Sequence, residues 1–100
     1  MVTQEERAEI LQGAINKWGE ALQMDMVIEE CAELIQAINK LRRGKDGAIS
    51  NVREELADVQ IMIDQMRLIF DNECIQQREN DKLIRLANRL GIIRKEDSHV

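Results

Sequence analysis

The chain contains no proline and no tyrosine, and its only aromatic residues are one tryptophan and one phenylalanine. A core with so few rings has to be built from aliphatic side chains, and without proline the helices run unbroken. This composition favours helices over strands, which are enriched in β-branched and aromatic residues. A chain of 100 residues is long enough for one domain, but its small size leaves much surface exposed, so a partner subunit is expected.

The chain also lacks a surplus of positive charge, since its formal net charge is -5. Proteins that bind nucleic acid polymers normally present cations to the phosphates, so that class is not expected.

Cys31 and Cys74 lie far apart with no adjacent histidine, which argues against a zinc site or a disulfide framework. No apolar run reaches the ~18 residues of a membrane span, and the acidic start is unlike a signal peptide, so we expect a soluble cytoplasmic protein without membrane contacts.

Helical signals fall into four blocks separated by short polar breaks. Thr3 and Glu6 have the spacing of a capping box, which predicts that a first helix begins there and continues to a break at Gly19. The other predicted elements are a helix over 20–42, a loop over 43–50 that contains Gly44, Gly47 and Ser50, a third helix from near Asn51 to about Cys74 or a little further, and a last helix that Asn80 or Asp81 caps and Gly91 ends. The predicted fold is all-α, a four-helix bundle with a central antiparallel hairpin, in which residues 1–93 form one domain and 94–100 a flexible tail.

Apolar residues repeat at alternating spacings of four and three along the two long helices, as in a helix–helix seam. The predicted seam consists of Val27, Cys31, Leu34, Ile38 and Leu41 on one helix, and of Val52, Leu56, Val59, Ile63, Met66 and Phe70 on the other. Ile61, Met62 and Ile69 lie outside this seam, and one hairpin cannot cover them all. We therefore expect a homodimer or homotetramer.

Acidic residues gather beside this seam. Glu30 with Glu33, and Glu55 with Asp58, form two pairs at spacing three, and the antiparallel hairpin should bring the two pairs to the same level. No lysine or arginine stands three or four positions from any of these acids. Because hard carboxylate oxygens suit Mg²⁺, with Mn²⁺ as a substitute, we expect the cluster to bind such an ion. The alternative is a solvated acidic face.

The segments Glu29-Glu30-Cys31-Ala32-Glu33 and Glu55-Leu56-Ala57-Asp58 resemble the E-E-x-x-E and E-x-x-D motifs of the MazG-like nucleoside triphosphate pyrophosphohydrolases. The similarity extends roughly from Ile15 to Phe70. It implies a four-helix, oligomeric enzyme that hydrolyses a (deoxy)nucleoside triphosphate to the monophosphate and pyrophosphate. The site residues that the resemblance implies are the metal ligands Glu30, Glu33, Glu55 and Asp58, and Glu29 as the group that orients or deprotonates water.

Substrate contacts are expected from two regions. Lys82, Arg85 and Arg89 follow one stripe of the last helix, and MazG-like proteins are similar in using basic residues from that region, although such a stripe is more often simply solvated. Trp18 can stack on a nucleobase and Gln23 can hydrogen-bond to one, whereas the alternative for a lone tryptophan is a packing anchor. His99, in the expected tail, is given no chemistry.

Two other classes of function stay open at this stage. The acids could hold a structural or redox metal, as in carboxylate-bridged bundles, although such bundles normally use Glu-x-x-His pairs that this sequence lacks. The chain could also be a non-enzymatic helical interaction module whose acidic face binds a basic partner. The nucleobase and the sugar that a substrate would carry are left undetermined.

Overall fold

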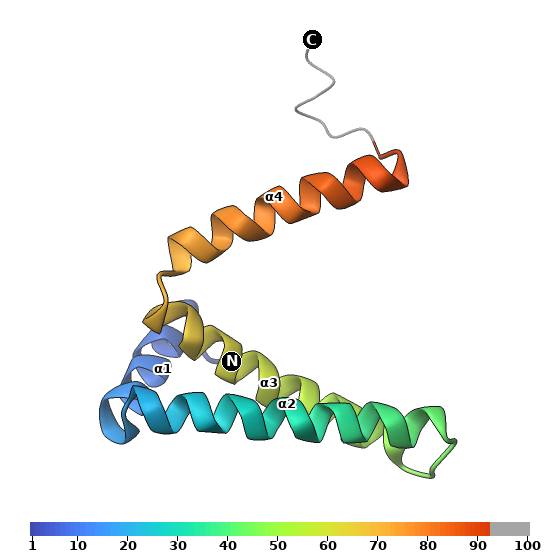
Figure 1. Cartoon of the computed structure of the whole chain (residues 1–100). Coiled ribbons are helices and arrows are strands. Elements are labelled where there is room, and N and C mark those ends of the chain that lie inside the picture. The colour runs from blue at the N-terminus through green and yellow to red at the C-terminus, as the bar shows by residue number, and fades with distance from the viewer. Residues whose placement is uncertain (93–100) are drawn as a thin grey trace. The chain divides into compact units, whose positions relative to one another are not determined.

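The computed structural model describes residues 1–92 and consists of helices joined by short turns (Figure 1). The helices are α1 (Gln4–Trp18), α2 (Glu20–Arg42), α3 (Ala48–Ile69) and α4 (Asn72–Leu90). No strand occurs in these residues, which confirms the all-α class. The chain divides into one unit that holds α1, α2 and α3 and a second unit, from Phe70 onward, that holds α4. The expected tail, 94–100, and His99 lie outside the described residues.

Local rules place several helix ends correctly. The Thr3 hydroxyl accepts from the backbone N–H of Glu6 at 3.0 Å, and the Glu6 carboxylate accepts from the backbone N–H of Thr3 at 3.1 Å, so the predicted capping box is confirmed. These hydrogen bonds from Thr3, the backbone one first, lower the pKa of Glu6. Gly19 separates α1 from α2 with a φ of 87°, a conformation that favours glycine. None of the helices within residues 1–92 is both long and apolar enough to cross a bilayer.

The predicted start of α3 near Asn51 is too late, because the helix begins at Ala48. Gly44 and Gly47 both have a φ of 74°, so the turn of the hairpin is completed before Ser50. The backbone N–H of Ala48 donates to the carbonyl of Lys45 at 3.3 Å, which closes that turn. Ser50 therefore lies in the first turn of α3 and does not cap it.

The predicted boundary between the third and fourth helices is also wrong. Asp71 stands between α3 and α4 with a φ of 72°, and its carboxylate accepts from the backbone N–H of Cys74 at 3.3 Å. This side-chain cap starts α4 well before Asn80 and Asp81, which lie inside the helix. The predicted stop at Gly91 is confirmed, since Gly91 has left-handed backbone geometry and caps the helix.

The helices α2 and α3 run antiparallel beside each other as the predicted hairpin, and α1 packs against both (Figure 1). The buried residues along the hairpin are Gln23 and Ala37 of α2, and Ala48, Val59, Met62 and Gln65 of α3. Glu30 stands seven residues from both Gln23 and Ala37, and Glu55 stands seven residues from both Ala48 and Met62. Because residues seven apart repeat on one side of a packed helix, both glutamates face the interface between the helices.

The predicted seam is therefore partly wrong. Five of its members are exposed, namely Ile38, Leu41, Leu56, Ile63 and Phe70, whereas Met62, which was expected outside the seam, is buried. A helix can carry two neighbouring rows of residues that both repeat at spacings of four and three. In this hairpin the buried row contains alanine and glutamine side chains, whereas the more aliphatic row is largely exposed. The hairpin thus keeps an apolar strip on its surface.

A polar contact fixes α1 to α3. The Arg7 guanidinium donates to the Asp64 carboxylate at 2.6 Å, and Gln60 donates to the other oxygen of the same carboxylate at 3.0 Å. Further along α1, the side chains of Leu11 and Ile15 are buried. One ion pair and two aliphatic anchors therefore hold α1 in place.

We predict that Arg7 and Asp64 are energetically coupled. Their side chains are 35% and 27% exposed, so water screens the pair in part, and we expect a coupling free energy of about 0.5–1 kcal/mol. Urea unfolding of Arg7→Ala, Asp64→Ala and the double variant gives this energy as a double-mutant cycle. Strictly additive effects of the two single changes would show that the contact contributes nothing to stability.

Candidate metal and nucleotide site

Three carboxylates meet between the two helices of the hairpin. Glu30 of α2 and Glu55 and Asp58 of α3 each offer one oxygen, and these three oxygens lie within 4.8 Å of one another. Glu55 and Asp58 are one helical turn apart, so both reach the same level of α2. The structure thus brings together three of the four acids predicted to bind a metal.

Glu33, the fourth predicted ligand, lies at the border of this group. Its side chain is exposed and does not belong to the group of three, but its negative charge raises the pKa of both Glu30 and Glu55. Glu33 thus interacts electrostatically with both glutamates, and its role as a metal ligand stays a prediction. Glu29, about 100° from Glu30 around α2, is also exposed and lies outside the group.

The central carboxylates are short of partners. The Oε2 atoms of Glu30 and Glu55 are buried, and neither has a hydrogen-bond partner among the described residues. Within the same part of the chain, none of the clustered acids forms a salt bridge. Loss of hydration is the main cause that raises the pKa of Glu30 and of Glu55, and the charges of Glu33 and Asp58 add to it.

An unpaired buried carboxylate oxygen is costly, and several like charges in one place increase the cost. A hard divalent cation relieves both problems at once, because it takes oxygen ligands and carries the opposite charge. No histidine or cysteine belongs to the cluster, which suits Mg²⁺ or Mn²⁺ better than softer metals. The residues present therefore fit such an ion.

A cavity of about 350 Å³ lies in the same unit as the acids. Its walls are Trp18, Leu22, Gln23, Met26, Met62 and Gln65. The two residues that were predicted to contact a nucleobase thus line one cavity: Trp18 is 52% exposed at its wall, and Gln23 is only 5% exposed. The Lys17 ammonium lies 5.3 Å from the centre of the Trp18 ring, so one face of the indole already carries a cation.

Gln65 is the residue of this cavity that the sequence reasoning missed. It is 4% exposed, and its carbonyl oxygen accepts from the Gln23 amide at 2.6 Å. One signal could have found it: Gln65 follows Asp58 by seven residues, as Glu30 follows Gln23. Each glutamine therefore lies on the same face of its helix as the acid seven residues away.

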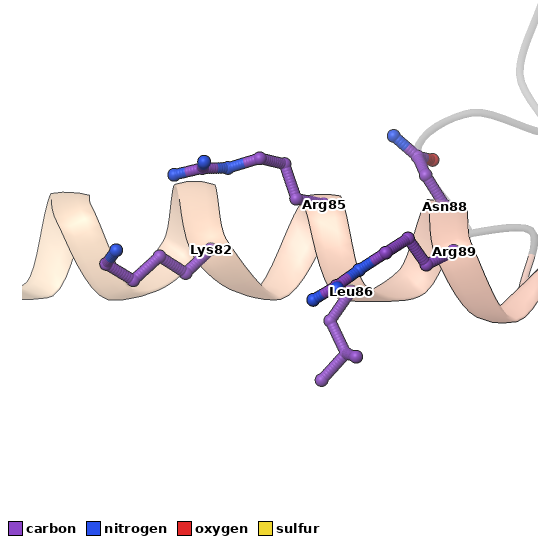
Figure 2. A pocket seen from close by; sticks show the side chains of 5 residues that line it. All are labelled: Lys82, Arg85, Leu86, Asn88 and Arg89. Carbon is purple, nitrogen blue, oxygen red and sulfur yellow. The ribbon is translucent and has the colours of Figure 1, made fainter.

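The predicted basic stripe is present on α4, which belongs to the second unit and is described by itself. Lys82, Arg85 and Arg89 line one open pocket together with Leu86 and Asn88 (Figure 2). Figure 2 shows the three cationic side chains extending toward the N-terminal end of the helix, the usual direction for long side chains. Their contact with phosphates stays a prediction.

The comparison with protein families agrees with this geometry. The model of the MazG nucleotide pyrophosphohydrolase domain matches residues 19–85. The chain belongs to the MazG family. The match in this MazG protein covers α2, α3 and most of α4, so it begins later and runs further than the expected similarity from Ile15 to Phe70. Searches of curated proteins and of solved structures found no significant match.

Membership in the family assigns the broad chemistry, since its members are hydrolases that act on nucleotide pyrophosphate bonds and generally use a divalent metal. The match includes every residue of the acidic cluster, Gln23, Gln65 and the cations Lys82 and Arg85. It excludes Trp18 and the rest of α1. The aromatic wall of the cavity is therefore contributed by a part of the chain that the family model does not describe.

We predict that the acidic cluster makes the metal-free protein less stable as the pH rises. The pKa values of Glu30 and Glu55 in the native state lie above the ordinary 4.5, so near that pH the native state keeps protons that the unfolded state has released. This contribution to stability is present at low pH and is lost as the pH rises through the raised pKa values. Thermal unfolding with a chelator between about pH 5 and pH 8 measures it.

The double change Glu30→Gln and Glu55→Gln should flatten this decline, whereas Glu9→Gln, at an exposed position on α1, should leave it unchanged. Addition of Mg²⁺ should raise the melting temperature most at the upper end of the pH range, because the ion binds the deprotonated carboxylates. Identical pH profiles for the native sequence and the double variant would contradict the burial of these charges.

Proposed function

We propose that this MazG protein hydrolyses a (deoxy)nucleoside triphosphate to the monophosphate and pyrophosphate with Mg²⁺ as its cofactor. The observation that carries the proposal is the pair of buried carboxylate oxygens of Glu30 and Glu55 that have no partner among the described residues. A solvated acidic face would not bury these atoms between two helices. A polyphosphate substrate, itself strongly anionic, needs a cation of this kind to approach them.

Four carboxylates would hold the ion. Glu30, Glu55 and Asp58 supply the oxygens that already lie together, and Glu33 completes the set from the next turn of α2. When bound, Mg²⁺ neutralises charge on the phosphate oxygens and lowers the pKa of water. The packing of α2 against α3 fixes the two glutamates at the centre, so the ligands need little rearrangement.

Glu29 is assigned the role of the base. Glu29 is exposed and precedes Glu30 directly on α2, so its carboxylate would accept a proton from water without binding the ion itself. The water oxygen forms a bond to the α-phosphorus, and the bond from this phosphorus to the bridging oxygen of the β-phosphate breaks. Pyrophosphate leaves with the electron pair of that bond, and Glu29 passes its proton to solvent.

The remaining contacts follow from position and charge. The cavity beside Trp18 and Gln23 is assigned to the nucleobase, because its walls are apolar and two amides close it. Gln23 precedes Glu30 by seven residues, about 10 Å along a helix, which is comparable to the distance from a base to the phosphates in an extended nucleotide. Lys82 and Arg85 are assigned to phosphate contacts on charge alone.

A panel of ribonucleoside and deoxyribonucleoside triphosphates, assayed for pyrophosphate release with and without Mg²⁺, tests the proposal. Glu33→Gln and Asp58→Asn should each lower kcat/KM by at least about 100-fold with circular dichroism unchanged, because each removes a metal ligand or its close neighbour. Asp46→Asn, at an exposed acid in the turn between α2 and α3, is the matched control and should keep full activity.

Full activity of the Glu33 and Asp58 variants would refute the ligand assignment. Absence of Mg²⁺-dependent turnover with every nucleotide would favour a structural metal site or a protein interaction module instead.

We further propose that the protein self-associates through a group of exposed apolar residues on one flank of the hairpin. Ile28, Ile35, Ile49 and Leu56 are 68%, 61%, 55% and 51% exposed, and helical geometry places them on the flank away from Glu33 and Asp58. A copy that covers this group would leave the acids accessible. Sedimentation should therefore give a dimer or tetramer at micromolar concentration, and Ile28→Lys with Ile35→Lys should shift it toward monomer. A stable monomer of the native sequence would contradict this.

A further inference from the structure

Two glutamines in the wall of the cavity form a buried contact with each other. Gln23 of α2 and Gln65 of α3 are 5% and 4% exposed, and the amide of Gln23 donates to the carbonyl of Gln65 at 2.6 Å. The other walls of the cavity are Trp18, Leu22, Met26 and Met62. A pair of buried amides in apolar surroundings carries a desolvation cost that one shared hydrogen bond does not fully offset.

Each amide keeps hydrogen-bonding capacity beyond this contact. A glutamine has two N–H donors and a carbonyl that accepts twice, and the shared bond uses one donor of Gln23 and one lone pair of Gln65. The amide of Gln65 otherwise lies only 3.7 Å from the Met62 sulfur, a weak acceptor. The carbonyl oxygen of Gln23 and the second N–H of Gln65 are therefore left for a ligand, an acceptor next to a donor.

The order of acceptor and donor can be reversed without moving the backbone. Each terminal amide exchanges its oxygen and nitrogen by a half-turn about its last torsion angle. If both amides turn, Gln65 donates to Gln23, and the ligand meets a donor on Gln23 beside an acceptor on Gln65. The shared hydrogen bond is kept in both arrangements, so the two turns are coupled.

We propose that Gln65, together with Gln23, is a specificity-determining residue that makes this site accept amino and keto nucleobases alike. This inference rests on the proposed function. An amino base such as cytosine presents an exocyclic N–H donor beside a ring-nitrogen acceptor. A keto base such as uracil presents a carbonyl acceptor beside a ring N–H donor. The coupled amides match the first edge in one arrangement and the second edge in the other.

The position of the pair supports this assignment. Gln23 precedes Glu30 by seven residues along α2, and Gln65 follows Asp58 by seven along the antiparallel α3, so both amides lie on the same side of the acids, about 10 Å away. The Lys17 ammonium covers one face of the Trp18 ring, which leaves the other face for stacking. A base held there would direct its edge at the amides and its phosphates at the carboxylates.

The test compares dCTP and dUTP, which have rings of the same size and differ in the donor and acceptor order of this edge. With Mg²⁺, the native protein should hydrolyse both with kcat/KM values within about tenfold of each other, because either order finds a complementary arrangement. Gln65→Glu and Gln23→Glu, assayed at about pH 8.5 so that the new carboxyl is ionised, can only accept at the changed position.

Because the two positions face neighbouring atoms of the base, the two variants should change the dCTP-to-dUTP ratio in opposite directions, each by at least about tenfold, as expected for one unpaired buried polar group. Gln65→Met, which keeps the volume but cannot donate, should lower both rates by a similar factor and leave the ratio unchanged. Circular dichroism and the melting temperature check that each variant is folded, and either glutamate variant alone suffices if the other does not fold.

Smaller changes in the ratio, or shifts in the same direction, would show that the glutamines only join the two helices. A native protein that prefers one of the two nucleotides by more than about 100-fold would overturn the inference even without the variants. In both of these cases the enzyme is active, so the proposed function stands. Inactivity of the native protein with every nucleotide would instead remove the proposed function on which the inference rests.

Discussion

The constraint on which the rest of this structure depends is the burial of carboxylates between two packed helices. Glu30 and Glu55 occupy positions along the hairpin where apolar side chains normally lie, and they bury oxygen atoms that no described residue satisfies. Burial of a charge in this way is unfavourable, and either uptake of a proton or a bound cation relieves the cost. The hairpin therefore carries a local cost in stability at these acids, as is common at sites that have to be preorganised.

Much of the fold could be predicted from the sequence because local rules govern it. The Thr3 cap and the glycines at 19 and 91 each follow from the geometry of a single turn. The break at Asp71 was missed because a non-glycine residue with positive φ leaves no mark in hydrophobic periodicity. The seam was misplaced for a related reason: periodicity counts aliphatic residues, whereas this interface is built largely from alanines, amides and acids.

In the candidate site, too, some residues could be predicted from local sequence and others could not. The four acids could be found because no lysine or arginine stands three or four positions from any of them, a property of the sequence alone. Gln65 could not be found in this way, since its importance comes from a contact with Gln23, 42 positions earlier in the chain. The roles of all these residues in metal and substrate binding depend on ligands and stay predictions.

The single residue between α1 and α2 has a wider consequence. Gly19 turns the chain with a φ of 87°, and open space surrounds the position of its missing Cβ, so backbone conformation and not crowding is what this residue provides. Trp18 stands directly before this joint, and Leu22 and Gln23 follow it in the first turn of α2. The backbone torsion angles at Gly19 thus help to set where Trp18 stands relative to the first turn of α2, so a sequence change at this joint would reshape this cavity while the carboxylates of α2 and α3 stay in place.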